Sequence, residues 1–207
     1  MKFETLADLP IQSPILVGVL DSDPASDTEI TLADLTGIGL IHLRGAEDEF
    51  GAAYGELPGD IGQVLPRSTD LAARMTDDEW VLIGADLTDV LTQVDANPRI
   101  TITDLTHGYG ILLVAGARAR AVLTTLCALD FSEPAFPDFH AAQTSLANVR
   151  TLIIRRDYAD QDAYLIAVGR SVTEYVWNRL MEATSGYARA LVAGEPWVQR
   201  VIRGSNE

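Results

Sequence analysis

The chain has 207 residues, of which 47% are apolar and 22% are charged, and its formal net charge is −15. This composition is typical of a soluble globular protein and argues against disorder and against a coiled coil. The negative charge makes nucleic acid an unfavourable partner, because phosphate binding requires clustered Lys and Arg. We expect no membrane segment and no signal peptide, since no apolar stretch is long enough and the first residues are acidic. The single cysteine, Cys127, fits a cytoplasmic protein.

The excess of negative charge lies entirely in residues 1–97, whereas residues 98–207 are electrically balanced and rich in arginine. Net charge informs on partners and solubility rather than on fold. Two interpretations stay open. The acidic half is an unspecific soluble surface, or the balanced half faces a partner while the acidic half faces water.

In chain order, the first half predicts strand, turn, strand, helix, strands and helix. Residues 29–35 alternate β-branched and polar side chains, as a half-buried strand does. Gly37 permits a tight turn into the next strand, and Gly45 marks the switch into a first helix. A second helix is expected to begin after Asp86, which is a suitable N-cap. Its apolar stripe would consist of Leu87, Val90, Leu91 and Val94.

The second half follows the same order. Residues 99–105 predict its first strand, and further strands are expected in residues 142–156 and 163–168, after a proline-bearing loop at 133–140. The last helix should begin at a capping box and stop near Gly186. The capping box consists of Ser171 and Glu174. The apolar face of the helix consists of Val172, Tyr175, Val176 and Leu180.

A repeat supports this division. The sequence D-L-T-G-I-G-L-I-H-L-R-G-A at residues 34–46 recurs as D-L-T-H-G-Y-G-I-L-L-V-A-G-A at residues 104–117. We therefore predict an α+β fold with helices packed on antiparallel sheets. Residues 1–207 would form a single domain of two pseudo-repeats, at about 29–97 and 98–187, with a short N-terminal arm and a C-terminal tail.

We find no motif for catalysis, metal binding or phosphate binding. The histidines, His42, His107 and His140, have no second ligand at metal-site spacing. Acidic groups at residues 77–79 and 157–162 precede strands, where solvated turn carboxylates are usual. We therefore predict no catalytic, cofactor-binding or metal-binding residue in this chain.

Two arginines, Arg118 and Arg120, fall at the start of a helix, where the helix dipole disfavours cations. Either both side chains extend into water or they meet carboxylates of another chain. Arg170 and Trp177 lie in the same half and are residue types that often anchor interfaces, although Trp177 can equally belong to the core. The predicted partner-facing surface consists of Arg118, Arg120, Arg170 and Trp177.

The second half also carries the motifs of a known family. They are D-L-T-H-G-x-x-I-x-L-x-x-G-A-x-A-x-x-V-L at 104–123, C-x-L-D-F at 127–131, Q-T-S-L-A at 143–147 and R-S-V-T-E-Y-V-W-N-R-L at 170–180. This order resembles the gamma subunit of heterotetrameric sarcosine oxidase. That family is similar to the folate-binding domain of glycine-cleavage aminomethyltransferases. The resemblance implies an internal duplication of two β-β-α-β-β-β-α halves.

The resemblance also implies a function. The chain would be a non-catalytic subunit of a flavoenzyme complex that oxidatively demethylates sarcosine to glycine and passes the one-carbon unit to tetrahydrofolate. Its partners would be alpha, beta and delta subunits, which would hold FAD, FMN, NAD, tetrahydrofolate and zinc. An interaction module of another N-methyl amino acid oxidase is a further possibility.

The alternative is a stand-alone folate-binding protein of the aminomethyltransferase type. The active aminomethyltransferases carry a G-G-x-x-D-D-like segment, whose place is taken here by residues 147–154. This stretch contains no aspartate, and with the paired aspartates the carboxylate expected to handle the folate adduct is missing. The departure argues against the alternative.

Overall fold

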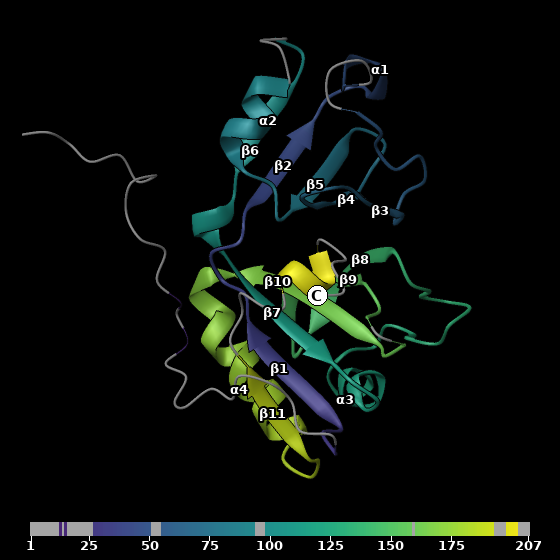
Figure 1. Ribbon diagram of the computed structural model, residues 1–207, viewed down its shortest axis with the longest axis vertical. Coiled ribbons are helices and arrows are strands. Elements are labelled where there is room, and N and C mark those ends of the chain that lie inside the picture. Colours follow the sequence, from purple (N-terminus) through teal and green to yellow (C-terminus); the bar gives the residue numbers. More distant parts are fainter. Residues whose placement is uncertain are drawn as a thin grey trace, which may run out of the picture.

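The computed structural model describes residues 13, 15, 27–50, 55–93, 98–158, 160–192 and 198–202. In this part of the chain two β-sheets face each other, and helices cover their outer faces (Figure 1). The strands are buried on both faces at their centres. Successive side chains alternate along each strand, so that one set of apolar side chains faces the opposite sheet and the other set faces the helices.

The larger sheet has six strands in the order β11-β1-β7-β10-β9-β8. All neighbours are antiparallel except β1 and β11, which are parallel. Helices α3 (Ala119–Leu126) and α4 (Thr173–Ala183) pack on its outer face. The strands are β1 (Ile30–Asp34), β7 (Tyr109–Ala115), β8 (His140–Leu146), β9 (Val149–Arg155), β10 (Ala163–Gly169) and β11 (Arg189–Val192).

The smaller sheet has five antiparallel strands in the order β3-β4-β5-β2-β6. They are β2 (Leu40–Arg44), β3 (Val64–Pro66), β4 (Leu71–Arg74), β5 (Glu79–Ile83) and β6 (Thr101–Asp104). Helices α1 (Glu47–Phe50) and α2 (Leu87–Gln93) cover its outer face, where the rings of Phe50 and Trp80 meet edge to face at 5.3 Å. Among the described residues, none of the helices has the length and apolar character needed to cross a lipid bilayer.

The two sheets share one strand order. The series β3-β4-β5-β2-β6 corresponds term by term to β8-β9-β10-β7-β1, and β11 is added at the edge of the larger sheet. The first strand of each half is exchanged, because β1 pairs with β7 of the second half and β6 pairs with β2 of the first. Neither half can therefore complete its sheet without the other.

The Asp-Leu-Thr repeat lies where the chain crosses from one sheet to the other. In the first copy, Asp34 Oδ1 accepts a hydrogen bond from the Thr36 N–H at 2.9 Å. The Leu35 N–H donates to the Ile111 carbonyl at 2.7 Å, and Thr36 Oγ1 accepts from the Ile111 N–H at 3.3 Å. This turn thus binds both backbone groups of Ile111, in a strand of the other half.

The second copy makes the same contacts in the opposite direction. Asp104 Oδ1 accepts from the Thr106 N–H at 2.9 Å. The Leu105 N–H donates to the Leu40 carbonyl at 2.8 Å, and Thr106 Oγ1 accepts from the Leu40 N–H at 3.0 Å. Each copy of the repeat therefore forms two hydrogen bonds to the backbone of one residue in the other half, and we call these two turns the Asp-Leu-Thr clasps.

The sheets are also joined at one edge. The Val64 N–H of β3 donates to the Phe139 carbonyl at 2.8 Å, and the Ala141 N–H of β8 donates to the Gly62 carbonyl at 2.7 Å. These bonds hold β3 beside the first residues of β8. The exchanged strands and this edge contact together fix the spacing between the two inner faces.

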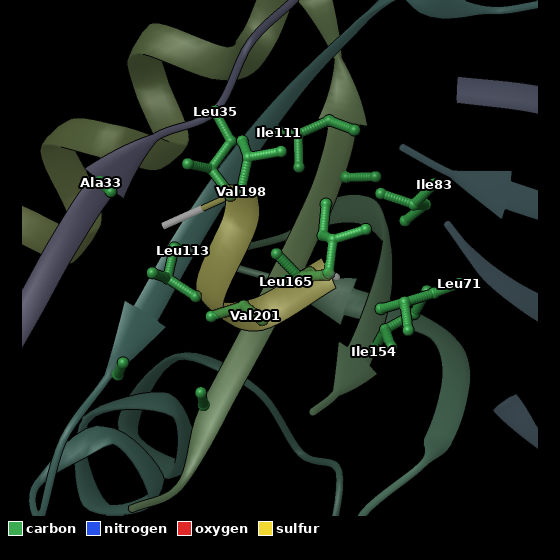
Figure 2. Packing of buried hydrophobic residues seen from close by; sticks show 14 of the residues in the cluster. Ala33, Leu35, Leu71, Ile83, Ile111, Leu113, Ile154, Leu165, Val198 and Val201 are labelled. Atoms are coloured by element: carbon green, nitrogen blue, oxygen red, sulfur yellow. The ribbon is translucent and has the colours of Figure 1, made fainter. Parts of the chain in front are cut away.

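A single π-helical turn at the C-terminal end, Val198–Ile202, lies between the sheets (Figure 1). Figure 2 shows Val198 and Val201 among Leu113 and Leu165 of the larger sheet. The larger sheet leaves room for this turn because small side chains line its inner face. These are Ala33, Ala115, Ala141, Ala163, Ala167 and Ala190.

The helices differ in part from expectation. Asp86 caps α2 as predicted, since its Oδ1 accepts from the Thr88 N–H at 2.7 Å. Val90 is buried, but Leu91 is exposed, so the predicted apolar stripe is narrower than expected, and Val94 lies outside the described residues. Val90 is the one buried residue of α2, and Leu87 packs partly buried against the same cluster.

The predicted capping box of α4 does not form. Ser171 lies in a 3₁₀ turn, Arg170–Val172, and the helix begins at Thr173, whose Oγ1 donates to the Gly169 carbonyl at 3.2 Å. The buried face of α4 consists of Thr173, Val176, Trp177 and Leu180.

Part of the predicted C-terminal tail is a strand. Residues Arg189–Val192 form β11, which pairs in parallel with β1. The sequence signal is weak because a four-residue strand is too short to show a clear alternation. The α+β class, with helices on antiparallel sheets, is confirmed.

We predict that Ile202→Ala lowers the free energy of unfolding by about 2–4 kcal/mol, because Ile202 is 1% exposed and its loss leaves a cavity between the sheets. Its Cγ2 lies so close to Gly84 that a Cβ there would be at 2.7 Å. Urea unfolding measures the change. The matched control is Ile61→Ala, which should shift stability by less than about 0.5 kcal/mol because Ile61 is 62% exposed. Equal shifts for both variants would show that the turn does not pack between the sheets.

Candidate functional site

A cleft lies between the inner faces of the two sheets. It consists of two adjoining cavities of about 410 and 280 Å³. The larger cavity extends toward Gly169 and Val172, at the start of α4, and the smaller one reaches the inner face of the five-stranded sheet. The residues that line both cavities are Tyr109, Gln143, Arg150, Leu152 and Ala167.

The five-stranded sheet contributes a charged pair to this cleft. In β2, His42 follows Leu40 on the inner face, and in β5 Glu79 precedes Val81 on the same face. The His42 Nε2 lies 3.9 Å from Glu79 Oε1, and the Arg44 guanidinium lies 3.8 Å from the same oxygen. Glu79 is thus shared between two basic side chains.

The six-stranded sheet contributes a guanidinium and an amide. Arg150 and Leu152 alternate with outward-facing residues along β9, and Gln143 lies opposite Leu152 on β8. The Arg150 guanidinium donates to Gln143 Oε1 at 2.9 Å. Sequence reasoning did not single out this group. The sequence feature that could have indicated it is the spacing of Arg150 and Leu152, which are two residues apart and therefore share one face of a predicted strand.

The β8–β9 hairpin occupies the place of the G-G-x-x-D-D-like segment. Its turn residues, Ala147 and Asn148, have φ of 49° and 66°, a region that glycine enters without strain. In the motif that the resemblance implies, the places of the paired aspartates would fall on Thr151 and Leu152. Thr151 is buried, and Leu152 presents an apolar side chain to the cleft.

The carboxylates of the cleft bear on whether it could hold a folate. A pterin ring presents N–H groups that require a free acceptor such as a carboxylate. Among the residues that line the two cavities, Glu79 is the sole carboxylate, and it already faces His42 and Arg44. Within the described part of the chain, no group of three or more His, Cys, Asp or Glu side chains is arranged to hold a metal ion.

A buried charge network lies outside the cleft. Arg155 is 2% exposed and donates to both carboxylate oxygens of Asp157, at 3.0 and 2.7 Å, to Asp162 Oδ1 at 3.0 Å and to the Phe136 carbonyl at 2.8 Å. Burial alone would lower the pKa of Arg155, but its hydrogen bonds with Asp157 and Glu133 outweigh burial and raise the pKa above its usual value. Asp157 and Asp162 are therefore not solvated turn carboxylates, as the sequence predicted, but partners of a buried arginine.

Next to this network, the hydroxyl group of Tyr164 is buried under α3 and the 132–139 loop. The ring packs edge to face on Phe131 at 5.5 Å and is stacked with Phe136 at 6.5 Å. Burial and the nearby charge of Asp162 raise the pKa of Tyr164 to about 12. The phenol therefore stays protonated at neutral pH, and the site offers no base there.

Arg118 finds a carboxylate within its own chain. Its Nε donates to Glu29 Oε1 at 3.1 Å, and the guanidinium lies 5.7 Å from the centre of the Tyr187 ring. The other Glu29 oxygen accepts from the Ala188 N–H at 3.1 Å. This backbone hydrogen bond and the one from Arg118 lower the pKa of Glu29. Arg118 thus ties the start of α3 to the start of β11.

Arg120 joins the buried network. Its guanidinium donates to Asp162 Oδ1 at 2.8 Å and lies 3.8 Å from Glu133 Oε2. The hydrogen bond with Asp162 raises the pKa of Arg120. The sequence left two interpretations open, in which Arg120 extends into water or meets carboxylates of another chain. In the structure Arg120 instead pairs with carboxylates of its own chain.

The remaining predicted interface residues, Arg170 and Trp177, lie on either side of the α4 N-terminus. Arg170 is half-buried in the 3₁₀ turn that precedes the helix. Trp177 is 5% exposed and packs in the cluster between α4 and the larger sheet. Its predicted surface position is therefore wrong, because Trp177 continues the i, i+3, i+4, i+7 stripe that begins at Thr173.

Comparisons with known proteins agree with this fold. The family model of the GCVT N-terminal domain matches residues 62–193. The chain is 28% identical over 173 residues to sarcosine oxidase subunit gamma from Corynebacterium sp. (strain U-96), covering 82% of this chain and 75% of that protein. It is also 32% identical over 84 residues to an aminomethyltransferase from Exiguobacterium sibiricum, covering 41% of this chain and 23% of that protein.

Two solved structures are similar as well. The heterotetrameric sarcosine oxidase from Corynebacterium sp. U-96, in complex with pyrrole 2-carboxylate, contains a chain that matches with a TM-score of 0.71 and 25% identity, covering 82% of this chain and 91% of that one. The glycine cleavage system aminomethyltransferase T from Bartonella henselae matches with a TM-score of 0.62 and 17% identity, over 86% of this chain and 51% of that one, which shows a shared fold. The chain belongs to the GCVT N-terminal domain family and is a homologue of the sarcosine oxidase gamma subunit.

Proposed function

We propose that this chain is the gamma-type subunit of a heterotetrameric sarcosine oxidase-like complex and has no catalytic activity of its own. The observation that carries the proposal is the extent of the similarity, which covers 82% of this chain and 75% of the gamma subunit from Corynebacterium. The cleft adds support, because its one carboxylate is engaged with two basic groups and its Arg150 with an amide. Nothing in that arrangement forms a nucleophile with an adjacent base.

In this proposal the complex oxidatively demethylates sarcosine to glycine and transfers the one-carbon unit to tetrahydrofolate. Alpha, beta and delta subunits are the partners, and they hold FAD, FMN, NAD, tetrahydrofolate and zinc. The complex acts in the cytoplasm. The gamma-type chain then stabilises the assembly rather than the transition state.

We further propose that the fold arose by internal duplication, with residues 1–207 forming one domain of two pseudo-repeats. The support is the shared strand order of the two sheets together with the reciprocal contacts of the two Asp-Leu-Thr copies. Because the first strands are exchanged, the duplicated halves would be stable only together.

We predict that the isolated chain is colourless and forms no peroxide when it is supplied with sarcosine and oxygen. The same chain, tagged and purified from its native source, should bring larger chains with it, and the eluate should absorb as a flavoprotein. Absorbance at 450 nm and a peroxide assay measure both. Turnover of sarcosine by the pure isolated chain would contradict the assignment as a non-catalytic subunit.

The second candidate, a stand-alone folate-binding protein of the aminomethyltransferase type, rests on the similarity to the two aminomethyltransferases. The match covers 23% of one and 51% of the other, so a large part of each aminomethyltransferase lies outside the matched region. Leu152 also replaces a carboxylate at the cleft wall. These differences favour the subunit.

We predict that tetrahydrofolate gives no saturable heat with the isolated chain at roughly tens of micromolar ligand, because the one carboxylate that lines the two cavities, Glu79, already faces His42 and Arg44. Isothermal titration calorimetry measures this, and a folate-binding aminomethyltransferase serves as the positive control. Stoichiometric binding to the isolated chain would favour the second candidate.

For the partner-facing surface we propose Arg118 and Arg170, while Arg120 serves the internal network and Trp177 the core. Arg118 is more exposed than Arg120, with 52% of its side chain accessible against 37%. An exposed ion pair can exchange its carboxylate for one of a partner at small cost.

We predict that Arg120→Glu lowers the free energy of unfolding by roughly 1–3 kcal/mol, because it places a carboxylate against Asp162 and Glu133. Arg118→Glu should cost less than about 1 kcal/mol, since its pair with Glu29 is exposed. Urea unfolding of both variants measures the difference. The folded Arg118→Glu chain should also recover less of the larger subunits at moderate salt. Normal recovery would exclude Arg118 from the interface.

A further inference from the structure

One guanidinium in the wall of the cleft has no carboxylate partner. Arg150 lines both cavities, and its guanidinium donates to the neutral amide oxygen of Gln143. In the described part of the chain no carboxylate forms an ion pair with Arg150, whereas Arg155, further along the same strand, pairs with Asp157 and Asp162. The Arg150 side chain is exposed, so its charge is accessible to a ligand that enters the cleft.

The donors around Arg150 match a carboxylate. A guanidinium offers five N–H groups in a flat fork, which binds the two oxygens of a carboxylate in parallel. Gln143 uses its Oε1 to accept from Arg150, which leaves the two N–H donors of its Nε2 group for other partners. Both side chains line both cavities, and a ligand in either cavity can reach them.

The rest of the cleft is suited to an uncharged body. Apolar side chains of Val81, Leu105 and Leu152 line the smaller cavity, together with the ring of Tyr109. The volumes of about 280 and 410 Å³ lie near the lower end of the range for small-molecule sites. A ligand there would bury an aliphatic or aromatic portion against these side chains.

The opposite wall limits the charge of the ligand. Glu79 carries a negative charge that repels a second anionic group. The same carboxylate lies 3.8 Å from the Arg44 guanidinium and 3.9 Å from His42 Nε2, and therefore it does not require a cationic group on the ligand. The arrangement favours one negative charge at Arg150 and none elsewhere.

We propose that the cleft between the sheets binds a small organic monocarboxylate, whose carboxylate group pairs with Arg150 and Gln143 and whose apolar portion packs against Leu152, Val81 and Tyr109. The proposal goes beyond a role in assembly and does not depend on it, because all of these residues belong to this chain.

The test is calorimetric titration of the isolated full-length chain, so that sites on partner subunits contribute nothing. The probes are benzoate, benzamide as a neutral molecule of the same shape, and inorganic phosphate as an anion without an apolar body. Benzoate should bind saturably with one site per chain. Benzamide and phosphate should bind at least about tenfold more weakly, because each lacks one of the two recognised features.

The variant Arg150→Gln removes the charge and keeps a polar side chain, and it should weaken benzoate binding by at least about tenfold. The matched control is Arg179→Gln, since Arg179 lies on α4 and pairs with Glu182 away from the cleft. It should leave benzoate affinity unchanged. Thermal unfolding of both variants verifies that they are folded.

Three results would overturn the proposal. The first is that benzoate gives no saturable heat up to roughly 10 mM, which would mean that its affinity is too low for a binding site. The second is equal benzoate affinity of the wild-type and Arg150→Gln chains. The third is that phosphate binds as tightly as benzoate. Each is independent of whether larger subunits co-purify with the chain, so failure here leaves the proposed function standing.

Discussion

The exchange of the first strands is the constraint on which the rest of the structure depends. Because β1 completes the sheet of the second half and β6 that of the first, each sheet requires both halves of the chain. The Asp-Leu-Thr clasps fix the crossing points, since each binds the N–H and the carbonyl of one residue in the opposite half. The inner faces are thereby held at a set spacing, and whatever fills the space between them must fit that spacing.

The chain fills this space in two different ways. One part is apolar and takes up the C-terminal turn, with Val201 and Ile202 against alanine-rich strands. The other part is polar and stays open as the cleft around Arg150. Close packing is favourable where apolar surfaces meet, whereas the exposed Arg150 guanidinium and the partly exposed Glu79 carboxylate favour contact with water or a ligand. The division of the space therefore follows from the chemistry of the inner faces.

Local patterns allowed much of the fold to be predicted. The strands β9 and β10 were evident because apolar and β-branched residues predominate in them. Asp86 was found as a cap because it acts on residues next to it. The repeat was visible as well, although its role as a clasp depends on contacts between residues 66 and 75 positions apart. Short β11 escaped notice because its partner, β1, lies at the other end of the described chain.

The site could not be predicted to the same degree, because its side chains interact over long distances in sequence. Arg118 and Glu29 are 89 positions apart, and Arg120 and Asp162 are 42 apart. Nothing near either arginine in the sequence reveals these carboxylates. Trp177 was placed wrongly because the stripe of α4 was counted from Val172 rather than from Thr173, which rotates the buried face by one residue.

These contacts also bear on the two interpretations of the charge distribution. The balanced second half owes much of its neutrality to ion pairs that are made inside the chain, by Arg120 and Arg155 with Asp162 and by Arg179 with Glu182. Charge used in this way is not available to attract a partner at long range. A balanced surface still lacks the repulsion that the acidic half would impose on an acidic partner. Association through the second half would therefore depend on shape and on a few exchangeable pairs such as that of Arg118, and not on an excess of free arginine.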